Sequence, residues 1–302
     1  MNQEYITANA WSIIEDDFDK DRVKSSESLF SLGNGAMGQR ANFEETYTGD
    51  TFQGSYIAGV YYPDKTRVGW WKNGYPEYFA KVLNAPNWIG INVTVNGVTL
   101  DLNTCKSITN YKRELNMKEG WYERSFTAVL PNDVEVNVSA KRFLSLTHDE
   151  LGVINYKVTP VNTKAVIDFS PYIDAGITNE DTNWDDKFWD ILSVTEADQQ
   201  GFITSKTMKT EFHVGTYMQS LVFVDGQKQN LKPSVTQSDS ELYYKYSLNV
   251  NKGEEASIQK FAGYVTDMNH KTSQLIDAAK TVLKESINLG YETLLKQQKD
   301  AW

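Results

Sequence analysis

Four pairs of adjacent acidic residues are the first candidates for chemistry in this chain. They are Asp16-Asp17, Glu44-Glu45, Glu180-Asp181 and Asp185-Asp186. Two carboxylates that flank a glycosidic bond are the machinery of a glycosidase. Adjacent residues on a strand point to opposite faces, however, so adjacency alone does not make a catalytic pair. We therefore expect these acids to lie in solvated loops or caps.

Aromatic residues gather in two segments that could hold a sugar. Residues 179–189 mix carboxylates with tryptophans, which suits sugar hydroxyls and a ring face, and the alternative is a surface loop pinned by its tryptophans. Residues 56–88 contain nine aromatic residues, interrupted by glycine and proline without a sustained period. Such a block is either a buried cluster or a surface for a ligand or partner.

Other chemical motifs find little support. Gly33, Gly35 and Gly38 fit the spacing G-x-G-x-x-G, but the residues after them lack an apolar helical stripe and no βαβ unit follows. We expect a tight turn between sheet elements there. A G-x-S-x-G nucleophile motif is absent, and Cys105 has no histidine near it in the sequence. Three scattered histidines (His148, His213 and His270) predict no metal site, and no cofactor is expected.

Composition narrows the choice of partners. The 302 residues carry a net charge of −10. Nucleic acids and anionic membranes attract proteins rich in Lys and Arg, so we expect neither as a partner. No apolar run is long enough for a transmembrane helix. The first residues lack a basic and apolar leader, so we expect a cytoplasmic location, with a removed signal peptide as the alternative.

The elements that must position these residues are mostly strands. Apolar residues alternate with polar ones on both sides of Asn96-Gly97, which predicts a hairpin with a type I′ turn that pairs Val95 with Val98. The same alternation recurs around the turn at 131–133 and in several later runs. Many short strands without helical segments between them predict a β-sandwich or barrel.

The pattern changes near residue 267. Apolar residues then recur every three or four positions, which predicts an amphipathic helix with Asp267 or Asn269 as its N-cap and a stop at Gly290. A second helical stripe runs from Tyr291 to Trp302. We expect this stripe to pack on a region that follows residue 302, with a helix folded back on the sheet as the alternative.

The motifs taken in order resemble a known family. The run 27–40, which contains Gly33, Gly35, Gly38 and Arg40, resembles the N-terminal signature of glycoside hydrolase family 65. That family contains inverting phosphorylases of maltose, trehalose, kojibiose and nigerose and related hydrolases. The other matching segments are Trp11 with Glu15, 54–61, 83–88, 111–115, 172–179 and 290–302. One departure is Ala41, where the family commonly has glycine after the arginine.

The resemblance implies a large antiparallel two-sheet β-sandwich over residues 1–266, then linker helices over 267–302 that lead to an (α/α) barrel. In the family this barrel carries the catalytic acid and the phosphate-binding loops, so no catalytic residue can be assigned in this chain. The implied role is that of a non-catalytic domain, inactive alone, that supports its own catalytic domain. The implied substrate of the parent is an α-linked disaccharide, with inorganic phosphate as co-substrate in a phosphorylase, and a homodimer is a further implied assembly.

The residues assigned to a substrate rim or interface are Trp70, Trp71, Tyr75 and Trp88. Gly33, Gly35, Gly38 and Arg40 are assigned to a structural turn. Two alternatives stay open: a free-standing carbohydrate-binding sandwich that uses the aromatics of 56–88 or 184–189, and a small complete glycosidase. The last requires two carboxylates that face one cleft.

Overall fold

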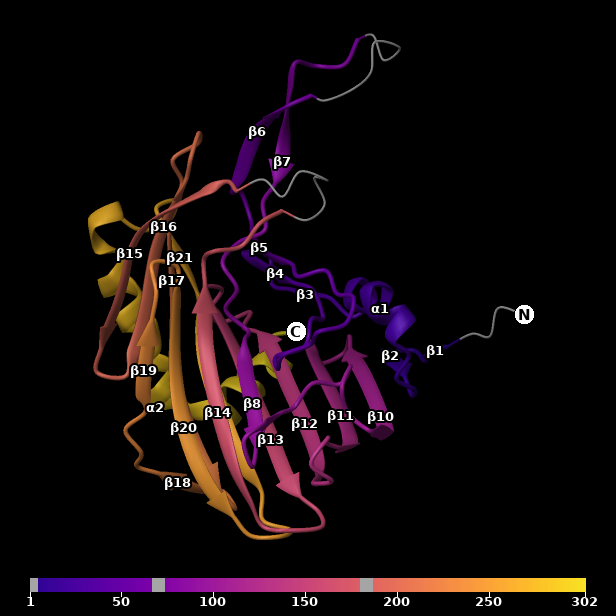
Figure 1. The fold of residues 1–302 in the computed structure, drawn as a ribbon. Helices are drawn as coiled ribbons and strands as arrows, with labels where there is room; N and C mark the ends of the chain where they lie inside the picture. Colours follow the sequence, from indigo (N-terminus) through magenta and orange to yellow (C-terminus); the bar gives the residue numbers. More distant parts are fainter. Residues whose placement is uncertain (1–4, 67–73, 180–186) are drawn as a thin grey trace.

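A long antiparallel sheet forms the framework of the molecule (Figure 1). The structure is a computed structural model that describes residues 5–66, 74–179 and 187–302. Its strand order is β1-β2-β10-β11-β12-β13-β21-β17-β16-β15, with β18 paired to β17. The strands are β1 (Ile6–Ala8), β2 (Ser12–Glu15), β10 (Ser107–Asn116), β11 (Trp121–Val129), β12 (Glu135–Leu144), β13 (Leu151–Pro160), β15 (Trp189–Ala197), β16 (Gln200–Thr207), β17 (His213–Val224), β18 (Gln227–Gln229) and β21 (Ala256–Thr266).

A second antiparallel sheet packs against one face of the long sheet. Its strand order is β19-β20-β14-β8-β9. The strands are β19 (Ser234–Gln237), β20 (Glu241–Val250), β14 (Ala165–Asp174), β8 (Ile91–Val95) and β9 (Val98–Thr99). Since both sheets end in free edge strands within the described residues, the fold is the two-sheet sandwich and not a closed barrel.

Smaller elements complete the fold. Helix α1 (Val23–Leu29) follows the short 3-10 turn η1 (Lys20–Arg22). A three-stranded sheet joins β3 (Leu32–Gly33), β4 (Met37–Gln39) and β5 (Ser55–Ile57). The hairpin of β6 (Tyr61–Lys65) and β7 (Tyr78–Val82) stands out from one end of the sandwich (Figure 1).

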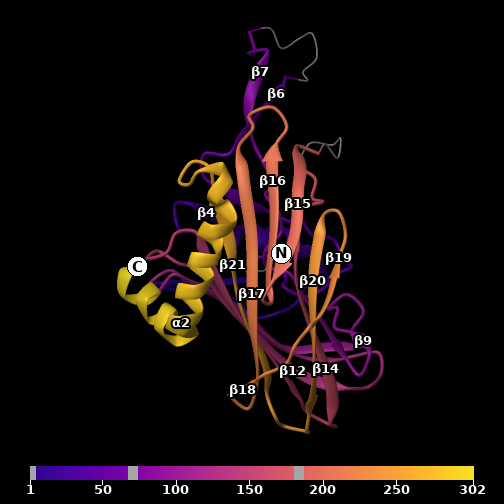
Figure 2. The same cartoon turned by 90° about the vertical axis from the view of Figure 1, so that its left-hand side faces the viewer.

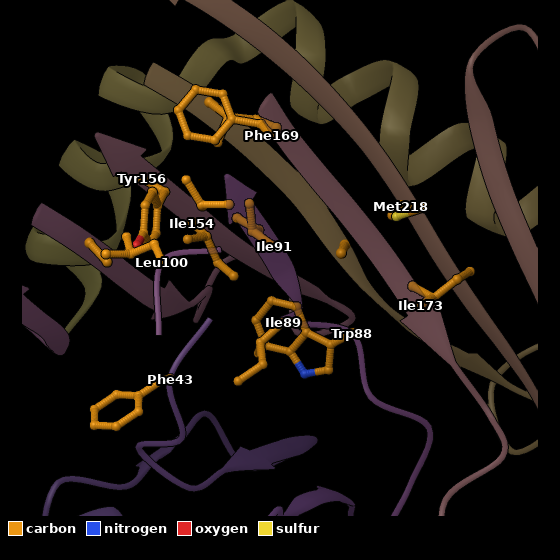
Figure 3. Close-up of a cluster of buried hydrophobic side chains, with 14 of the residues drawn as sticks. Phe43, Trp88, Ile89, Ile91, Leu100, Ile154, Tyr156, Phe169, Ile173 and Met218 are labelled. Carbon is orange, nitrogen blue, oxygen red and sulfur yellow. The ribbon is translucent and has the colours of Figure 1, made fainter. Parts of the chain in front are cut away.

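Between the two sheets lies the larger of two apolar cores. Inward residues alternate along each strand, for example Ile154, Tyr156 and Val158 on β13, which are all fully buried. Figure 3 shows Trp88 and Ile89 in this core beside Ile91 of β8. The alternation that predicts half-buried strands in the sequence therefore also fixes which face packs inward.

The second core lies on the opposite face of the long sheet, under helix α2 (Leu275–Ala301). Figure 2 shows α2 lying along this face, where it contacts β21, β17 and β13. Leu275, Ala279 and Leu283 are buried there at helical spacing, which gives the molecule three layers.

The predicted hairpin and turns are confirmed. Val95 pairs with Val98, and Asn96 and Gly97 have φ of 52° and 77°, as a type I′ turn requires. Gly290 interrupts α2 with φ of 76°, where the sequence predicts a helix stop. The helix start is different: the N-cap is Gln274, after the 3-10 turn η3 (Thr272–Gln274), and neither Asp267 nor Asn269 caps it.

The expected packing of the last helical stripe is also corrected. Tyr291 and Leu294 are buried against the long sheet, and Trp302 donates from Nε1 to the Met117 carbonyl at 2.6 Å. Gln298 is fully buried and bonds to Leu146 N and to the Gly120 carbonyl. This stripe is therefore the folded-back helix, because the outer face of the long sheet offers it an apolar surface.

Candidate functional site

Within the described residues, exposed aromatic side chains gather on the hairpin β6–β7, which we call the arm. Its register pairs Tyr61 with Val82 and Lys65 with Tyr78. Exposure is 49% for Tyr78, 44% for Phe79 and 62% for Val82, and Tyr75 beside the arm reaches 57%. A two-stranded hairpin alone is marginally stable in water. An arm that exposes apolar side chains in this way is typical of a surface that meets a partner or ligand.

The base of the arm is firmly attached to the sandwich. Thr210 donates to the Tyr61 carbonyl at 2.8 Å, and Lys209 donates to the Pro63 carbonyl at 3.2 Å. The Lys209 ammonium also lies 4.7 Å from the centre of the Tyr62 ring. Tyr62 in turn packs on Phe188 with ring centres 4.5 Å apart. The arm is thus presented in a fixed direction by the turn between β16 and β17.

The residues assigned to a rim separate in the structure. Tyr75 is exposed beside the arm, and Trp70 and Trp71 lie outside the described residues. Trp88 is fully buried between the sheets, so its assignment to a rim or interface is wrong. Gly152 explains how the indole is accommodated, because a Cβ there would lie 2.2 Å from the Trp88 ring.

Residues 179–189 also lose part of their predicted role. Trp189 is 6% exposed and donates from Nε1 to the Asn84 carbonyl at 2.8 Å, and Phe188 is 4% exposed. These two side chains belong to the core and not to a sugar surface. Trp184 and the acidic pairs Glu180-Asp181 and Asp185-Asp186 lie outside the described residues.

The signature turn is a β-hairpin. Gly33 pairs with Gly38 across β3 and β4, and Gly35 has φ of 92°, a conformation that favours glycine. Asn34 accepts from the amides of Ala36 and Met37 and donates to the carbonyls of Ser145 and Asp149. The turn is therefore tied to the connection between β12 and β13, and no helix follows it as a dinucleotide site would need.

Arg40 joins this hairpin to α1. Its guanidinium donates to the Phe52 carbonyl, the Ser28 hydroxyl and the Lys24 carbonyl at 2.6 to 2.9 Å. Ala41, which stands where glycine is common in the family, is buried and donates to the Glu27 carbonyl at 2.8 Å. Its φ is not positive, so this position does not require glycine.

Glu44 and Glu45 are not solvated, in contrast to the expectation from the sequence. Both carboxylates bind the buried Arg124 of β11, at 3.0 Å for Glu44 and at 2.6 and 2.7 Å for Glu45. Glu44 also accepts from the buried Arg142 of β12 at 2.9 Å. Burial alone would lower the pKa of Arg124, but Glu45 and Glu44 outweigh it and hold that pKa well above its usual value. Both carboxylates are thus engaged in ion pairs with buried arginines.

A third buried pair extends this network along the sheet. Arg113 of β10 lies directly opposite Arg124 and has its Nε 3.4 Å from a Glu15 carboxylate oxygen. Burial raises the pKa of Glu15, and Arg113 acts in the opposite direction. Apolar periodicity does not predict this network, although each of the strands β10, β11 and β12 contains an arginine. Because its charges are paired with one another, we interpret the network as one that stabilises the fold.

The first acidic pair of the chain is exposed, and two of the three histidines pair with carboxylates. Asp16 and Asp17 are exposed, as expected. His213 pairs with Asp267 at 3.1 Å, and His270 pairs with Glu150 at 2.8 Å. In the described part of the chain no group of three or more His, Cys, Asp or Glu side chains could hold a metal ion. No described helix is long and apolar enough to cross a membrane.

One cavity lies against the signature turn, and we call it the turn cavity. Its volume is about 270 Å³. Its walls come from the signature turn, the end of β5, the turn before β13, and the end of β21. The lining residues are Ala36, Met37, Ile57, Ala58, Asp149, Glu150, Tyr264, Thr266, Met268 and Asn269.

Comparison with known proteins assigns the class of this sandwich. Residues 13–302 match the family model described as glycosyl hydrolase family 65, N-terminal domain, and the chain belongs to this family.

Several of its relatives are phosphorylases. Maltose phosphorylase of Bacillus subtilis (strain 168) is 37% identical over the whole chain, which covers 39% of that protein. Alpha,alpha-trehalose phosphorylase of Thermoanaerobacter brockii is 29% identical over 96% of the chain and 38% of that protein. A solved structure titled "Putative kojibiose phosphorylase from human microbiome" superimposes with a TM-score of 0.86 at 26% identity, over 98% of this chain and 38% of the other. The chain thus spans well under half the length of these relatives.

Proposed function

We propose that this chain is the non-catalytic N-terminal domain of an inverting α-glucoside phosphorylase or hydrolase. In this role the sandwich supports a catalytic (α/α) barrel, and the arm contributes to the rim of the barrel's substrate pocket. The parent would cleave an α-linked disaccharide, with inorganic phosphate as co-substrate if it is a phosphorylase. The observation that carries the proposal is the arm, which presents exposed aromatic side chains beyond the body of a sandwich of this family.

The carboxylates of the described residues support a non-catalytic role. Asp149 and Glu150 line one cavity, but they are neighbours on a single turn, and Glu150 is held by His270 at 2.8 Å. An inverting enzyme needs an acid and a base on opposite sides of the glycosidic bond, roughly 6.5–9.5 Å apart. Glu44 and Glu45 are neutralised by arginine. The catalytic acid is therefore expected in the barrel, where it would protonate the leaving oxygen while phosphate or water attacks the opposite face.

The competing function is a free-standing carbohydrate-binding module. It depended on the aromatics of 56–88 and 184–189, and two of its tryptophans, Trp88 and Trp189, are buried. Activity of the complete protein separates the two functions, because a binding module alone has no turnover.

Two assays test the proposal. The purified chain is expected to release no glucose 1-phosphate and no glucose from maltose, trehalose, kojibiose or nigerose, with or without phosphate. The full-length protein that carries this domain is expected to cleave at least one of these sugars. Turnover by the chain alone, or no turnover by the full-length protein, would contradict the proposal.

The role of the arm is tested in the full-length protein. Phe79→Ala removes an exposed apolar side chain from the arm, and Leu192→Ala removes one of similar exposure, 49%, from edge strand β15. We expect kcat/KM for the disaccharide to fall about ten-fold for Phe79→Ala, because exposed aromatic anchors carry most of the energy of such contacts. Leu192→Ala should match the parent, and equal kinetics of the two variants would exclude the arm from the rim.

A further inference from the structure

The turn cavity has a rigid frame. Asn34 binds the signature turn to the carbonyls of Ser145 and Asp149 at 2.8 and 2.9 Å. The Glu150 carbonyl accepts from Tyr217 at 2.8 Å, and a Cβ on Gly263 would lie 2.1 Å from this carbonyl oxygen. The walls are therefore held by hydrogen bonds and close backbone packing, which is how a preformed binding site is built.

The cavity carries polar groups that have no partner of their own. Thr266 is only 5% exposed and lines the cavity, yet its hydroxyl has no hydrogen-bond partner among the described residues. A buried hydroxyl without a partner is costly and calls for an explanation, and a ligand in the cavity would supply the missing partner. The exposed Asp149 carboxylate also makes no hydrogen bond or ion pair within the described residues, although its backbone carbonyl is bound by Asn34.

Apolar side chains complete the lining. Met37 and Ile57 form one wall, and Met268, which is 44% exposed, lies at the edge above Gly59. The cavity thus combines two carboxylates and a hydroxyl with apolar contacts. A ligand with several hydroxyl donors and apolar C–H faces fits this lining. Its volume lies near the lower end of ligand pockets and suits one ring rather than an oligosaccharide.

We propose that the turn cavity is a binding site for one glucosyl ring, either free or at the end of a disaccharide. Asp149 accepts from the ring hydroxyls, Thr266 exchanges a hydrogen bond with one of them, and Met268 covers a C–H face. The choice of a glucosyl ring rests on the proposed function, whereas the cavity and its unpartnered hydroxyl do not.

The cavity and the arm share one end of the molecule, because Ala58 lines the cavity and β6 begins three residues later at Tyr61. A sugar held in the cavity is therefore held beside the base of the arm.

The test is ligand-observed NMR on the purified chain with glucose and, separately, maltose. We expect saturable binding with a Kd at or below about 10 mM. Asp149→Asn and Thr266→Val should weaken it about ten-fold or more, as expected when a hydrogen bond to a charged or buried group is lost. Asp239→Asn makes the same change at an exposed position outside the cavity and should bind like the parent. Equal binding of glucose and maltose indicates recognition of a single ring, and tighter binding of maltose indicates that the ring is taken at the end of a disaccharide.

Three results would overturn the proposal: no saturation by either sugar, unchanged binding by Asp149→Asn, or binding of CaCl2 or free lysine in place of sugar. Asp149 is exposed, so the Asp149→Asn variant does not depend on refolding of the core. If the chain binds no sugar while the full-length protein still cleaves a disaccharide, the site is refuted and the proposed function stands. If the chain binds sugar while the full-length protein has no turnover, the proposed function fails and the site remains.

Discussion

Buried charges are the main residue-scale feature that apolar periodicity does not describe. Arg113, Arg124 and Arg142 lie on three neighbouring strands, and each is at most 1% exposed. They meet acids that come from β2 and from residues 44–45 of the segment that covers this part of the sheet. Buried ions are tolerated only when they are paired and hydrogen-bonded. The ion pairs of Glu44 and Glu45 with these arginines therefore hold the covering segment in place on the sheet.

Loss of one arginine from this network should be severe. We expect Arg124→Ala to lower the free energy of unfolding by about 3–5 kcal/mol, because Glu45 is left buried without its bidentate partner and Glu44 keeps only Arg142. The matched control is Lys106→Ala, whose exposed pair with Asp133 should be worth less than about 1 kcal/mol. Urea denaturation measures both. A loss in Arg124→Ala no larger than that in the control would show that the network does not stabilise the fold.

Lys260 of β21 should make stability depend on pH. Its ammonium position is fully buried, and it donates to the carbonyls of Gly90 and Tyr172 at 2.8 and 2.6 Å. Burial lowers the pKa of Lys260 well below its usual value, and Glu44 opposes this shift only in part. The unfolded chain thus binds a proton that the folded chain lacks between the lowered pKa and about 10.4. In this window stability rises with pH.

Replacement by methionine should remove that dependence. The difference in free energy of unfolding between the parent and Lys260→Met is expected to shift in favour of the parent as pH rises, by up to about 1.4 kcal/mol per pH unit within the window. Urea denaturation from pH 7 to 10 provides the measurement. Parallel pH profiles of the two proteins would mean that Lys260 keeps its proton when folded.

At the scale of elements, the sequence predicts what depends on local periodicity and turn chemistry. The hairpin at Asn96-Gly97, the helical stripe with its stop at Gly290 and the glycine turn at 33–38 follow from neighbouring residues. The start of α2 does not, because His270 is engaged with Glu150 of a distant turn and the chain continues as a 3-10 turn before the helix.

The errors in the site assignment have a shared physical cause. Trp88 and Glu45 stand in segments that look like polar or glycine-rich loops, yet their burial is decided by partners far away in the sequence. Glu45 meets Arg124, 79 residues later, and Trp88 packs over Gly152. Only the three-dimensional pairing of strands brings these groups together, and sequence alternation carries no information on it. Of the residues assigned to a rim, Tyr75 lies within the described residues and is exposed.

The attachment of α2 offers a test at this scale. Gln298 is fully buried and bridges Leu146 N and the Gly120 carbonyl. We expect Gln298→Ala to speed amide hydrogen exchange in the last two turns of α2 by about ten-fold, since about one hydrogen bond's worth of local stability is lost. The control is Gln297→Ala, one position away on another face. Equal exchange in both variants would assign the attachment to Tyr291 and Leu294 instead.

At the scale of the whole molecule, we expect the connection between the two strands of the arm, residues 66–77, to be dispensable for folding of the sandwich. Lys65 pairs with Tyr78, so residues 66–77 can be replaced by an Asn-Gly turn that closes the hairpin at this pair. We expect the melting temperature of the chain to change little, because the base of the arm keeps its bonds to Lys209 and Thr210. In the full-length protein the same change should lower kcat/KM for the disaccharide. A large fall in melting temperature would instead make residues 66–77 part of the folding unit.

Strand β21 is enclosed on both sides. Ala256, Ile258, Ala262 and Tyr264 point into the core between the sheets, whereas Phe261 and Val265 point into the core under α2. Separation of the second sheet would expose one face of β21, and separation of α2 would expose the other. The strand is open to water on both faces only if both layers separate. Its amides should therefore be the last in the molecule to take up deuterium. A bulkier residue at Ala262 should destabilise the fold, because packing on both faces prevents the strand from shifting to make room.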